Sequence, residues 1–197
     1  AYMQALRARC TEVGALLILD EIQTGFGRTG KLFAFEHFGI APDILTIAKS
    51  MAGGMAMGAF VSHRDIMDTL KEDPILGHIT TFGGHPVCCA AALGNIQAIE
   101  EGNLVETCEE KGALLGSLLN HTAIVELRRI GMMFAVEFES ADLVYKIVDK
   151  CLEKGVIAFY FLSCPESFRL APPLTISEEE IRIAAIAINE AIEESVN

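Results

Sequence analysis

The sequence predicts an α/β protein in which the end of a parallel-sheet domain is followed by a smaller α+β unit. Two short apolar runs, residues 15–19 and 44–48, are bounded by turn residues and show no alternation with polar side chains. Such runs are typical of strands that are buried on both faces of a parallel sheet. Asp20 and Lys49 follow them directly. Because open α/β sheets bind ligands beyond the carboxyl ends of their strands, these two side chains are the first candidates for chemistry.

The first half of the chain alternates helices, strands and glycine-rich connections. Gly14 ends a helical pattern over residues 1–12, and Pro86 suits the first turn of a helix over residues 86–101. Residues 24–30 contain three glycines and two threonines at a spacing that differs from the GxGxxG nucleotide fingerprint, which predicts an irregular loop. The other elements expected here are a short helix over 31–38, strands over 44–48 and 59–62, and a helix over 64–71.

The second half has the pattern of an α+β unit. Helices are expected over residues 103–120 and 141–154, and Gly155 ends the second of them. Ser177 and Glu180 form a capping box at the start of the last helix. Strands are expected over residues 132–138, 156–162 and 168–170. Residues 127–129 are expected to lead into the first of these strands.

Composition excludes several classes of partner. The formal net charge of −12 and the lack of a Lys/Arg cluster argue against nucleic acids and anionic membranes, because both require a basic surface. The six cysteines show no CxxC spacing, so we expect reduced core thiols in a cytoplasmic protein and neither disulfides nor a metal site. The uncharged stretch 79–99 contains Pro86, Asn95 and Gln97, so we expect no membrane-spanning helix there. We predict a protein that acts on small molecules.

Three features have both a structural and a functional interpretation on the residues alone. Asp20 and Lys49 could form a plain ion pair, which is the commoner outcome for two such residues. Thr80 and Thr81, with the glycines before the helix at residue 86, could cap that helix or bind a phosphate at its N-terminus. Arg169 lies between apolar neighbours and requires either a structural ion pair or a ligand carboxylate.

Four ordered motifs resemble those of the class III pyridoxal-phosphate aminotransferases, the group of ornithine, acetylornithine and 4-aminobutyrate aminotransferases. They are DEIQTGFGRTG (20–30), IAK with its trailing glycines (47–54), TTFGGHP (80–86) and RLAPPLTI (169–176). The resemblance covers essentially the whole chain and implies fold type I of the pyridoxal-phosphate-dependent transferases. Residues 1–100 would be the end of the large domain, and residues 101–197 the C-terminal small domain. Since this matches only the C-terminal half of such an enzyme, we expect a fragment that is not competent alone.

The resemblance implies a role in binding pyridoxal 5'-phosphate for four residues of the first half. Lys49 matches the lysine that forms the Schiff base with the cofactor and afterwards moves protons. Asp20 matches the carboxylate that keeps the pyridine nitrogen protonated. Gln23 matches the amide at the ring's phenolic oxygen, and Ile22 would contact the ring face.

Other matching residues imply a substrate and a partner. Thr81 matches a threonine that reaches the phosphate of the neighbouring subunit, with Thr80 near the substrate, which implies a homodimer. Arg169 matches an arginine near the substrate carboxylate. The implied reaction moves an amino group from an ornithine-like or ω-amino donor to 2-oxoglutarate. The chain departs from the usual family pattern at Ala56, where a proline is common, and at His85, where an asparagine is common.

Three rival functions are weighed against this one. Another class III reaction, such as that of an aminomutase, racemase or decarboxylase, shares the cofactor residues. A non-catalytic homologue that acts as an interaction module is disfavoured by the intact Asp20, Gln23 and Lys49. A nicotinamide-dependent dehydrogenase is disfavoured because no predicted strand is followed by GxGxxG.

Overall fold

The computed structural model describes residues 1–75 and 77–197, which form two compact units. The first unit comprises residues 1–27 and 31–103, and the second comprises residues 28–30 and 104–197. Residues 28–30 come from the glycine-rich loop, so one short piece of the first half of the sequence packs within the second unit. The sequence analysis did not predict this. The assignment of the units to a large and a small domain stays a prediction.

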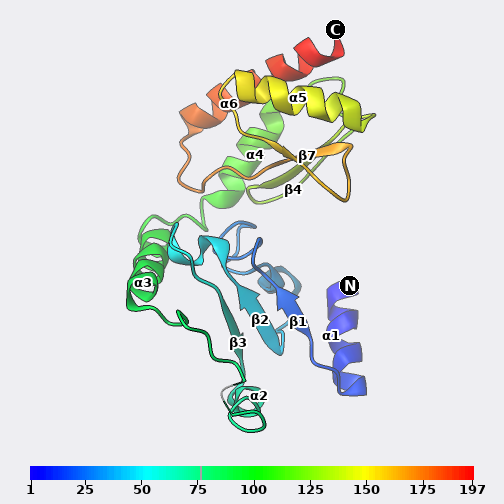
Figure 1. The fold of residues 1–197 in the computed structure, drawn as a ribbon. Coiled ribbons are helices and arrows are strands. Elements are labelled where there is room, and N and C mark those ends of the chain that lie inside the picture. Colours follow the sequence, from blue (N-terminus) through cyan, green and yellow to red (C-terminus); the bar gives the residue numbers. More distant parts are fainter. Residues whose placement is uncertain (76) are drawn as a thin grey trace. The chain divides into compact units, whose positions relative to one another are not determined.

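The first unit contains a three-stranded sheet in the order β1-β2-β3 (Figure 1). β1 (Ile18–Asp20) and β2 (Ile44–Ile47) are parallel, with Asp20 opposite Thr46, whereas β3 (Ala59–Ser62) is antiparallel to β2. The strand expected over residues 59–62 is confirmed, and it joins the parallel β1–β2 pair in the antiparallel direction. The physical reason is the short connection after β2, because a parallel neighbour requires a long crossover, usually through a helix.

The sheet of the first unit is covered less completely than the sequence predicts. Along the first apolar run, Leu17 is 6 % exposed, whereas Leu16 and Ile18 are 54 % and 57 % exposed. Alternation of this kind is typical of a sheet with one covered face. The prediction that residues 15–19 are buried on both faces is thus wrong for this chain, and the strand itself ends at Asp20 instead of before it.

The helices expected in the first unit occur in the predicted order, and the two short ones have narrower bounds than expected. The longest two confirm the expectations for residues 1–12 and 86–101. Only a 3₁₀ turn forms within 31–38, and the helix after β3 stops three residues before the expected end. The helical elements are α1 (Tyr2–Val13), η1 (Ala34–Phe38), η2 (Lys49–Ala52), α2 (Arg64–Asp68) and α3 (Pro86–Glu101).

The second unit contains a four-stranded antiparallel sheet in the order β4-β5-β7-β6, of which β4 and β7 are labelled in Figure 1. Its first strand extends one residue beyond each end of the lead-in predicted at residues 127–129, because it pairs along its full length with its neighbour. Residues 156–162 form only a two-residue strand, since only Phe159 and Tyr160 reach a partner. The strands are β4 (Glu126–Ile130), β5 (Met133–Glu137), β6 (Phe159–Tyr160) and β7 (Ser167–Leu170).

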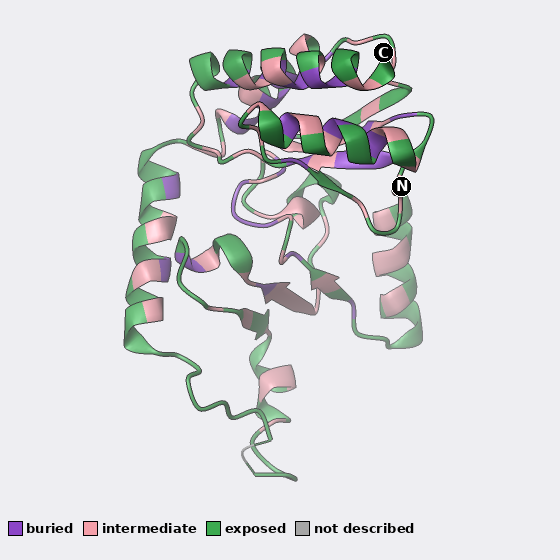
Figure 2. Ribbon diagram, turned by 45° about the horizontal axis from the view of Figure 1, so that its top comes forward, coloured by how far each residue is buried: buried purple, intermediate pink, exposed green. Residues whose placement is uncertain are grey.

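Three helices complete the second unit, and the last of them confirms its predicted capping box. They are α4 (Cys108–Leu118), α5 (Ala141–Glu153) and α6 (Glu178–Val196). Ser177 and Glu180 make the predicted capping box of α6. In α5, Val144, Ile147 and Cys151 are fully buried, and the buried sides of α5 and α6 are visible as purple bands in Figure 2. α4 begins at Cys108 instead of residue 103, because turns occupy residues 102–107.

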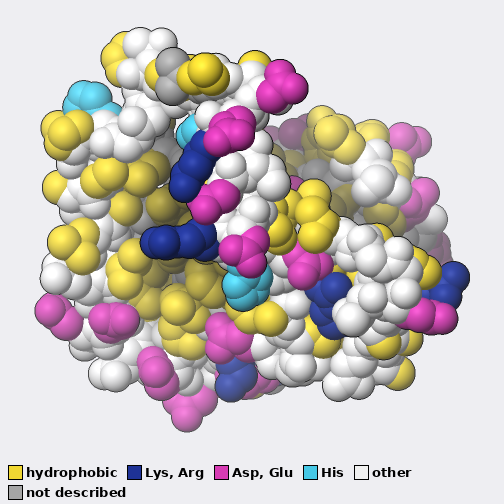
Figure 3. All heavy atoms as spheres, turned by 90° about the horizontal axis from the view of Figure 1, so that it is seen from below, with side chains coloured by type: hydrophobic (Ala, Val, Ile, Leu, Met, Phe, Trp, Pro, Cys, Tyr) yellow, Lys and Arg dark blue, Asp and Glu magenta, His cyan; other side chains and the backbone are white. Residues whose placement is uncertain are grey.

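Apolar side chains that reach the surface are numerous, and hydrophobic atoms occupy broad areas of the face in Figure 3. None of the helices formed by the described residues is long and apolar enough to cross a membrane.

Cys89 is exposed, so the expectation of a core thiol is wrong for this cysteine, whereas Cys108 and Cys151 are buried.

Candidate active site

The ends of β1 and β2 bring the two predicted charged residues to one edge of the first sheet. Because the strands are parallel and Asp20 lies opposite Thr46, Lys49 is three residues beyond that register position at the same edge. Both residues are exposed. None of the ion pairs between described residues joins Asp20 to Lys49. Each charge is therefore available at the sheet edge to an external partner.

Asp20 begins a turn that its own carboxylate stabilises. Its Oδ1 accepts a hydrogen bond from the backbone N–H of Ile22 at 2.9 Å. This is an Asx-type turn, in which the side chain replaces a backbone acceptor. Ile22 is half-buried and Gln23 is exposed in the same turn. The predicted cofactor residues of this motif thus come from one short segment whose geometry is set locally.

Glu21, beside Asp20, is the buried carboxylate that fixes this segment. It is 3 % exposed. Its Oε1 accepts from the N–H of Phe35 at 2.8 Å, and its Oε2 accepts from the N–H of Ala34 at 3.0 Å and from the Thr24 hydroxyl. Its own N–H donates to the Thr46 carbonyl at 3.0 Å, which continues the β1–β2 pairing past the strand end. Sequence analysis missed this role, although an acidic pair after an apolar run signals a partner for the second carboxylate.

Lys49 adopts a backbone conformation that is unusual for a residue with a side chain. Its φ is +49°, and it is the first residue of η2. Non-glycine residues in this region are uncommon and cluster at functional sites, where the surrounding structure holds them. The amine-bearing chain therefore leaves β2 through a sharp turn at the sheet edge.

Asn95 of α3 holds the turn that begins at Lys49. Its Nδ2 donates to the carbonyl of Ser50 at 2.6 Å and to that of Met51 at 3.5 Å. It also packs against Gly53, where a Cβ would lie 3.2 Å from the Asn95 Oδ1. The sequence signal for this contact is a polar amide that follows the apolar first half of α3.

Asp43 anchors the opposite end of the β1–β2 pair. Its Oδ2 accepts from the Leu17 N–H at 2.6 Å and from the Arg7 guanidinium at 2.6 Å. The Leu17 N–H, and after it Arg7, hold the pKa of this carboxyl below its usual value. The Ser62 hydroxyl donates to the Asp43 backbone carbonyl at 2.7 Å, which attaches β3 to the same point.

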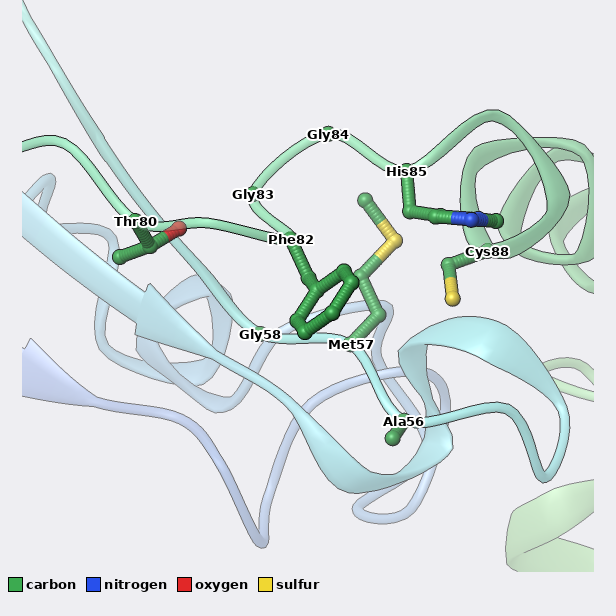
Figure 4. Close-up of a pocket in the computed structure, with 9 residues that line it drawn as sticks. All are labelled: Ala56, Met57, Gly58, Thr80, Phe82, Gly83, Gly84, His85 and Cys88. Atoms are coloured by element: carbon green, nitrogen blue, oxygen red, sulfur yellow. The ribbon is translucent and has the colours of Figure 1, made fainter.

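A pocket of about 210 Å³ lies between the segment before β3 and the segment before α3 (Figure 4). Figure 4 shows the side chains of Phe82 and Met57 next to each other in its centre, between Thr80 on one side and Cys88 on the other. A Cβ at Gly83 would lie 2.4 Å from the Thr80 hydroxyl oxygen, so the loop passes that hydroxyl closely. The lining residues are Ala56, Met57, Gly58, Thr80, Phe82, Gly83, Gly84, His85 and Cys88.

The loop before α3 contains the remaining predicted residues of the first unit. Thr80 and Thr81 are exposed, and only Thr80 lines the pocket. His85 is the N-cap of α3, since its Nδ1 accepts a hydrogen bond from the Val87 N–H at 3.3 Å. Within the described residues, no group of His, Cys, Asp or Glu has the arrangement of a metal site.

Arg169 lies in the second unit, in the inner strand β7. Its backbone pairs with Ala135 of β5 on one side and with Phe159 of β6 on the other. Its guanidinium carbon is 5.6 Å from the centroid of the Phe159 ring, a cation–π contact. The side chain is half-buried. Of the predicted site residues, Arg169 is thus held by a different unit from Asp20, Ile22, Gln23, Lys49, Thr80 and Thr81.

The donor set of the first unit fits pyridoxal 5'-phosphate chemically. Lys49 supplies an exposed amine for an aldehyde, Asp20 a carboxylate for a protonated ring nitrogen, and Gln23 an amide for a ring oxygen. The parallel β1–β2 pair places the first two at one edge of the sheet.

Comparisons with known proteins give a consistent result. A family model described as "Aminotransferase class-III" matches residues 1–192. A curated putrescine aminotransferase of Pectobacterium atrosepticum is 43 % identical over 186 residues, which cover 91 % of this chain and 40 % of the relative. The chain therefore spans about two fifths of the length of that relative.

Solved structures share the fold of the chain. An aminotransferase of Bacillus anthracis matches with a TM-score of 0.90 and 35 % identity over 98 % of this chain and 48 % of its own. An ornithine aminotransferase of Toxoplasma gondii, described with partial occupancy of pyridoxal phosphate, matches with a TM-score of 0.89 and 32 % identity. The match covers 100 % of this chain and 48 % of that structure's chain. An (S)-enantioselective ω-transaminase of Thermomicrobium roseum matches with a TM-score of 0.90 and 32 % identity. The match covers 100 % of this chain and 47 % of that structure's chain.

Proposed function

The chain belongs to the class-III aminotransferases, with fold type I, and on this premise we propose that the complete protein is an ω-amino-acid or diamine transaminase. It would transfer an amino group from an ornithine-like or other ω-amino donor to 2-oxoglutarate. The names of the putrescine and ornithine relatives support this class of donor, because both compounds present a terminal amine on a linear chain. The single observation that carries the proposal is the common edge of β1 and β2 at which Asp20 and Lys49 lie.

Class-III aminotransferases depend on pyridoxal 5'-phosphate, which supplies an electron-withdrawing ring that stabilises negative charge on the substrate carbon. Lys49 would hold the cofactor through its amine and then move a proton at the substrate carbon. The carboxylate of Asp20 would keep the proton on the ring nitrogen. Gln23 would donate to the ring oxygen, and the half-buried Ile22 would cover one ring face. Glu21 and Asn95 would keep the two turns in place through the hydrogen bonds described above.

The loop before α3 and the second unit would complete the substrate and cofactor contacts. We assign Thr81 to the cofactor phosphate of the partner subunit in a homodimer, and its exposure is compatible with an intermolecular contact. Thr80 would lie near the substrate, next to the pocket. Arg169 would bind a substrate carboxylate, for which a guanidinium is well suited. A cytoplasmic location is part of the same proposal.

The experiment is a substrate screen on the complete protein that contains this chain. Purified protein with pyridoxal 5'-phosphate is incubated with ornithine, diamines or other ω-amines and with 2-oxoglutarate, and glutamate formation is measured. We expect glutamate in amounts equal to the donor consumed. Loss of CO₂ from the donor, inversion of its stereocentre or migration of its amino group would instead indicate a decarboxylase, racemase or aminomutase. An unchanged cofactor absorbance on addition of protein would indicate a non-catalytic homologue.

A further inference from the structure

The tripeptide Arg28–Gly30 is built into the second unit by close backbone contacts. Gly131, in the turn between β4 and β5, has a φ of +53°. A Cβ on this glycine would lie 2.6 Å from the Thr29 carbonyl carbon and 2.8 Å from the Arg28 carbonyl oxygen. No side chain fits there, so the backbone of the tripeptide runs directly against the turn.

The turn is packed as closely on the α4 side. A Cβ on Gly112 of α4 would lie 2.1 Å from the carbonyl oxygen of Gly131. The Cys108 thiol, one turn earlier in α4, contacts the Arg28 carbonyl oxygen at 3.6 Å. The tripeptide is therefore part of the interior of the second unit and not a loose excursion of the preceding loop.

The Arg28 side chain joins two strands of the second sheet. Its Nη1 donates to the carbonyl of Met132, just before β5, at 3.2 Å and to the carbonyl of Pro172, just after β7, at 2.5 Å. The Met132 N–H returns a bond to the Arg28 carbonyl at 3.0 Å. β5 and β7 are antiparallel neighbours with Phe134 opposite Leu170, so one guanidinium connects the start of one inner strand to the end of the other.

Burying a guanidinium carries a desolvation penalty, so packing alone does not explain an arginine at this position. Burial lowers the pKa of Arg28, which means that the folded unit disfavours its charged form. An apolar side chain of similar length would fill the space without this cost. What it would lack is the pair of directed bonds to two carbonyl groups that belong to different strands. The geometry therefore indicates that these bonds fix the position of the strand ends.

We propose that Arg28 is a positioning residue for Arg169, through which it sets the affinity of the enzyme for acceptors that have a carboxylate. Arg169 lies three residues before Pro172, in the strand whose end Arg28 holds. The Lys111 amine also donates a hydrogen bond to the segment after β7, to the Leu174 carbonyl at 2.7 Å. Leu174 lies two residues beyond Pro172 and is therefore further along the chain from Arg169. Arg28 is thus the contact nearer to Arg169. The inference depends on the proposed function in one respect, the binding of a substrate carboxylate by Arg169.

The test variant is Arg28→Lys in the complete protein, and Arg128→Lys is the matched control. Lysine keeps the charge but ends one atom short of Nη1 and lacks the planar geometry that directs both bonds. Arg128 is an exposed arginine of the same sheet whose guanidinium binds Glu126 and Glu137. We expect Arg28→Lys to raise KM for 2-oxoglutarate about tenfold, since small displacements of a binding group are costly, and to leave KM for butanal, an acceptor without a carboxylate, within about twofold. Equal changes for both acceptors would overturn the proposal.

A double-mutant cycle separates action through Arg169 from general loosening of the unit. If Arg28 acts through Arg169, the double variant Arg28→Lys/Arg169→Lys has the same KM for 2-oxoglutarate as Arg169→Lys within about twofold. Independent, multiplying effects would contradict the proposal.

Hydrogen exchange provides a readout that does not depend on turnover. The Ile176 amide, which donates to the Pro173 carbonyl at 3.1 Å just after the contact with Arg28, should exchange faster in Arg28→Lys than in Arg128→Lys, with or without pyridoxal 5'-phosphate. Unchanged exchange there would overturn the positioning role even if the kinetics changed. Failure of the proposed function is a separate result: the unsubstituted protein would form no glutamate, while the exchange experiment would still decide whether Arg28 holds the end of β7.

Discussion

The two units of this chain differ in how much of their own apolar surface they bury. The second unit has one continuous core of eighteen buried residues from its sheet and helices, including Phe134, Ile147, Phe168 and Ile188. In the first unit Leu17, just before β1, and Ile47 of β2 are buried, but strand residues such as Ile18 are more than half exposed. Each predicted cofactor residue lies in the unit with the smaller core.

The difference teaches where stability and chemistry are expected to reside. Burial of apolar area is the main favourable term in folding, so the second unit should supply most of the cooperative stability of the chain. In the first unit, polar contacts hold the functional turns: Glu21 after β1, Asn95 at the turn of Lys49, and Asp43 before β2. Substitutions in the two units should therefore have different consequences, and four of them test this.

The largest expected effect is that of Asp20→Asn in the complete protein. Asparagine has the same shape and keeps an oxygen for the Ile22 N–H, but it provides no negative charge for a protonated ring nitrogen. We expect kcat to fall about 10³-fold, equivalent to about 4 kcal/mol of transition-state stabilisation, with an unchanged unfolding midpoint. The control Asp149→Asn, at an exposed position of α5, should keep kcat within about twofold. An Asp20→Asn enzyme of full activity would contradict the assignment of Asp20 to the ring nitrogen.

The next largest effect concerns the core of the second unit. Ile188 in α6 is 1 % exposed, whereas Ile186 in the same helix is 60 % exposed. Ile188→Ala should lower the free energy of unfolding by about 3 kcal/mol, because it removes buried carbons and leaves a cavity. Ile186→Ala should change it by less than about 0.5 kcal/mol. Urea denaturation measures both, and similar losses for the two variants would mean that the core does not dominate.

Glu21→Gln tests whether polar contacts hold the turn after β1. Both oxygens of Glu21 accept hydrogen bonds from N–H groups, so the amide nitrogen of glutamine must face one of those donors. We expect the free energy that holds this turn closed to fall by about 2 kcal/mol, which would be measured as faster hydrogen exchange of the Ala34 and Phe35 amides. Glu36→Gln is the control, because the exposed Glu36 accepts from the Phe33 N–H through one oxygen only. Equal exchange in the two variants would show that the buried carboxylate does not fix the turn.

The smallest effect is a pH dependence at Asp43. The Leu17 N–H and Arg7 lower its pKa in the folded state, so its stabilising contribution is present above the unfolded-state pKa of about 4 and is lost as the pH falls through the folded-state value. Asp43→Asn should therefore lower the midpoint of thermal unfolding at about pH 7, and the difference from the unsubstituted protein should shrink below about pH 4. A difference that is constant over this range would exclude a role of the charge.

Much of the fold could be predicted from local patterns. The helices at residues 2–13 and 86–101 and the capping box of Ser177 and Glu180 follow from glycine, proline and capping residues that act within one turn. Strand bounds were less accurate, because a strand exists only where a partner pairs with it. β6 is shorter than predicted because only two of its residues have a partner, whereas β4 is longer than predicted because all five of its residues pair with β5.

Long-range contacts limit what the sequence predicts about the site. Asp20 and Lys49 could be singled out because each ends an apolar run. The bonds of Arg28 to Met132 and Pro172 span more than 100 residues, and no local pattern marks them. Asn95 is similar, since its partner Ser50 lies 45 residues away. Such contacts determine how a motif is held, whereas the motif itself determines which chemical groups are present.

The central claim is that Lys49 holds the cofactor, and reduction with borohydride tests it most directly. The complete protein is saturated with pyridoxal 5'-phosphate, reduced, digested and examined by peptide mass spectrometry. We predict a phosphopyridoxyl group on Lys49, with Lys31 and Lys71 of the same unit unmodified as internal controls. A label on another lysine, or no label at saturation, would contradict the assignment of Lys49 as the residue that holds the cofactor.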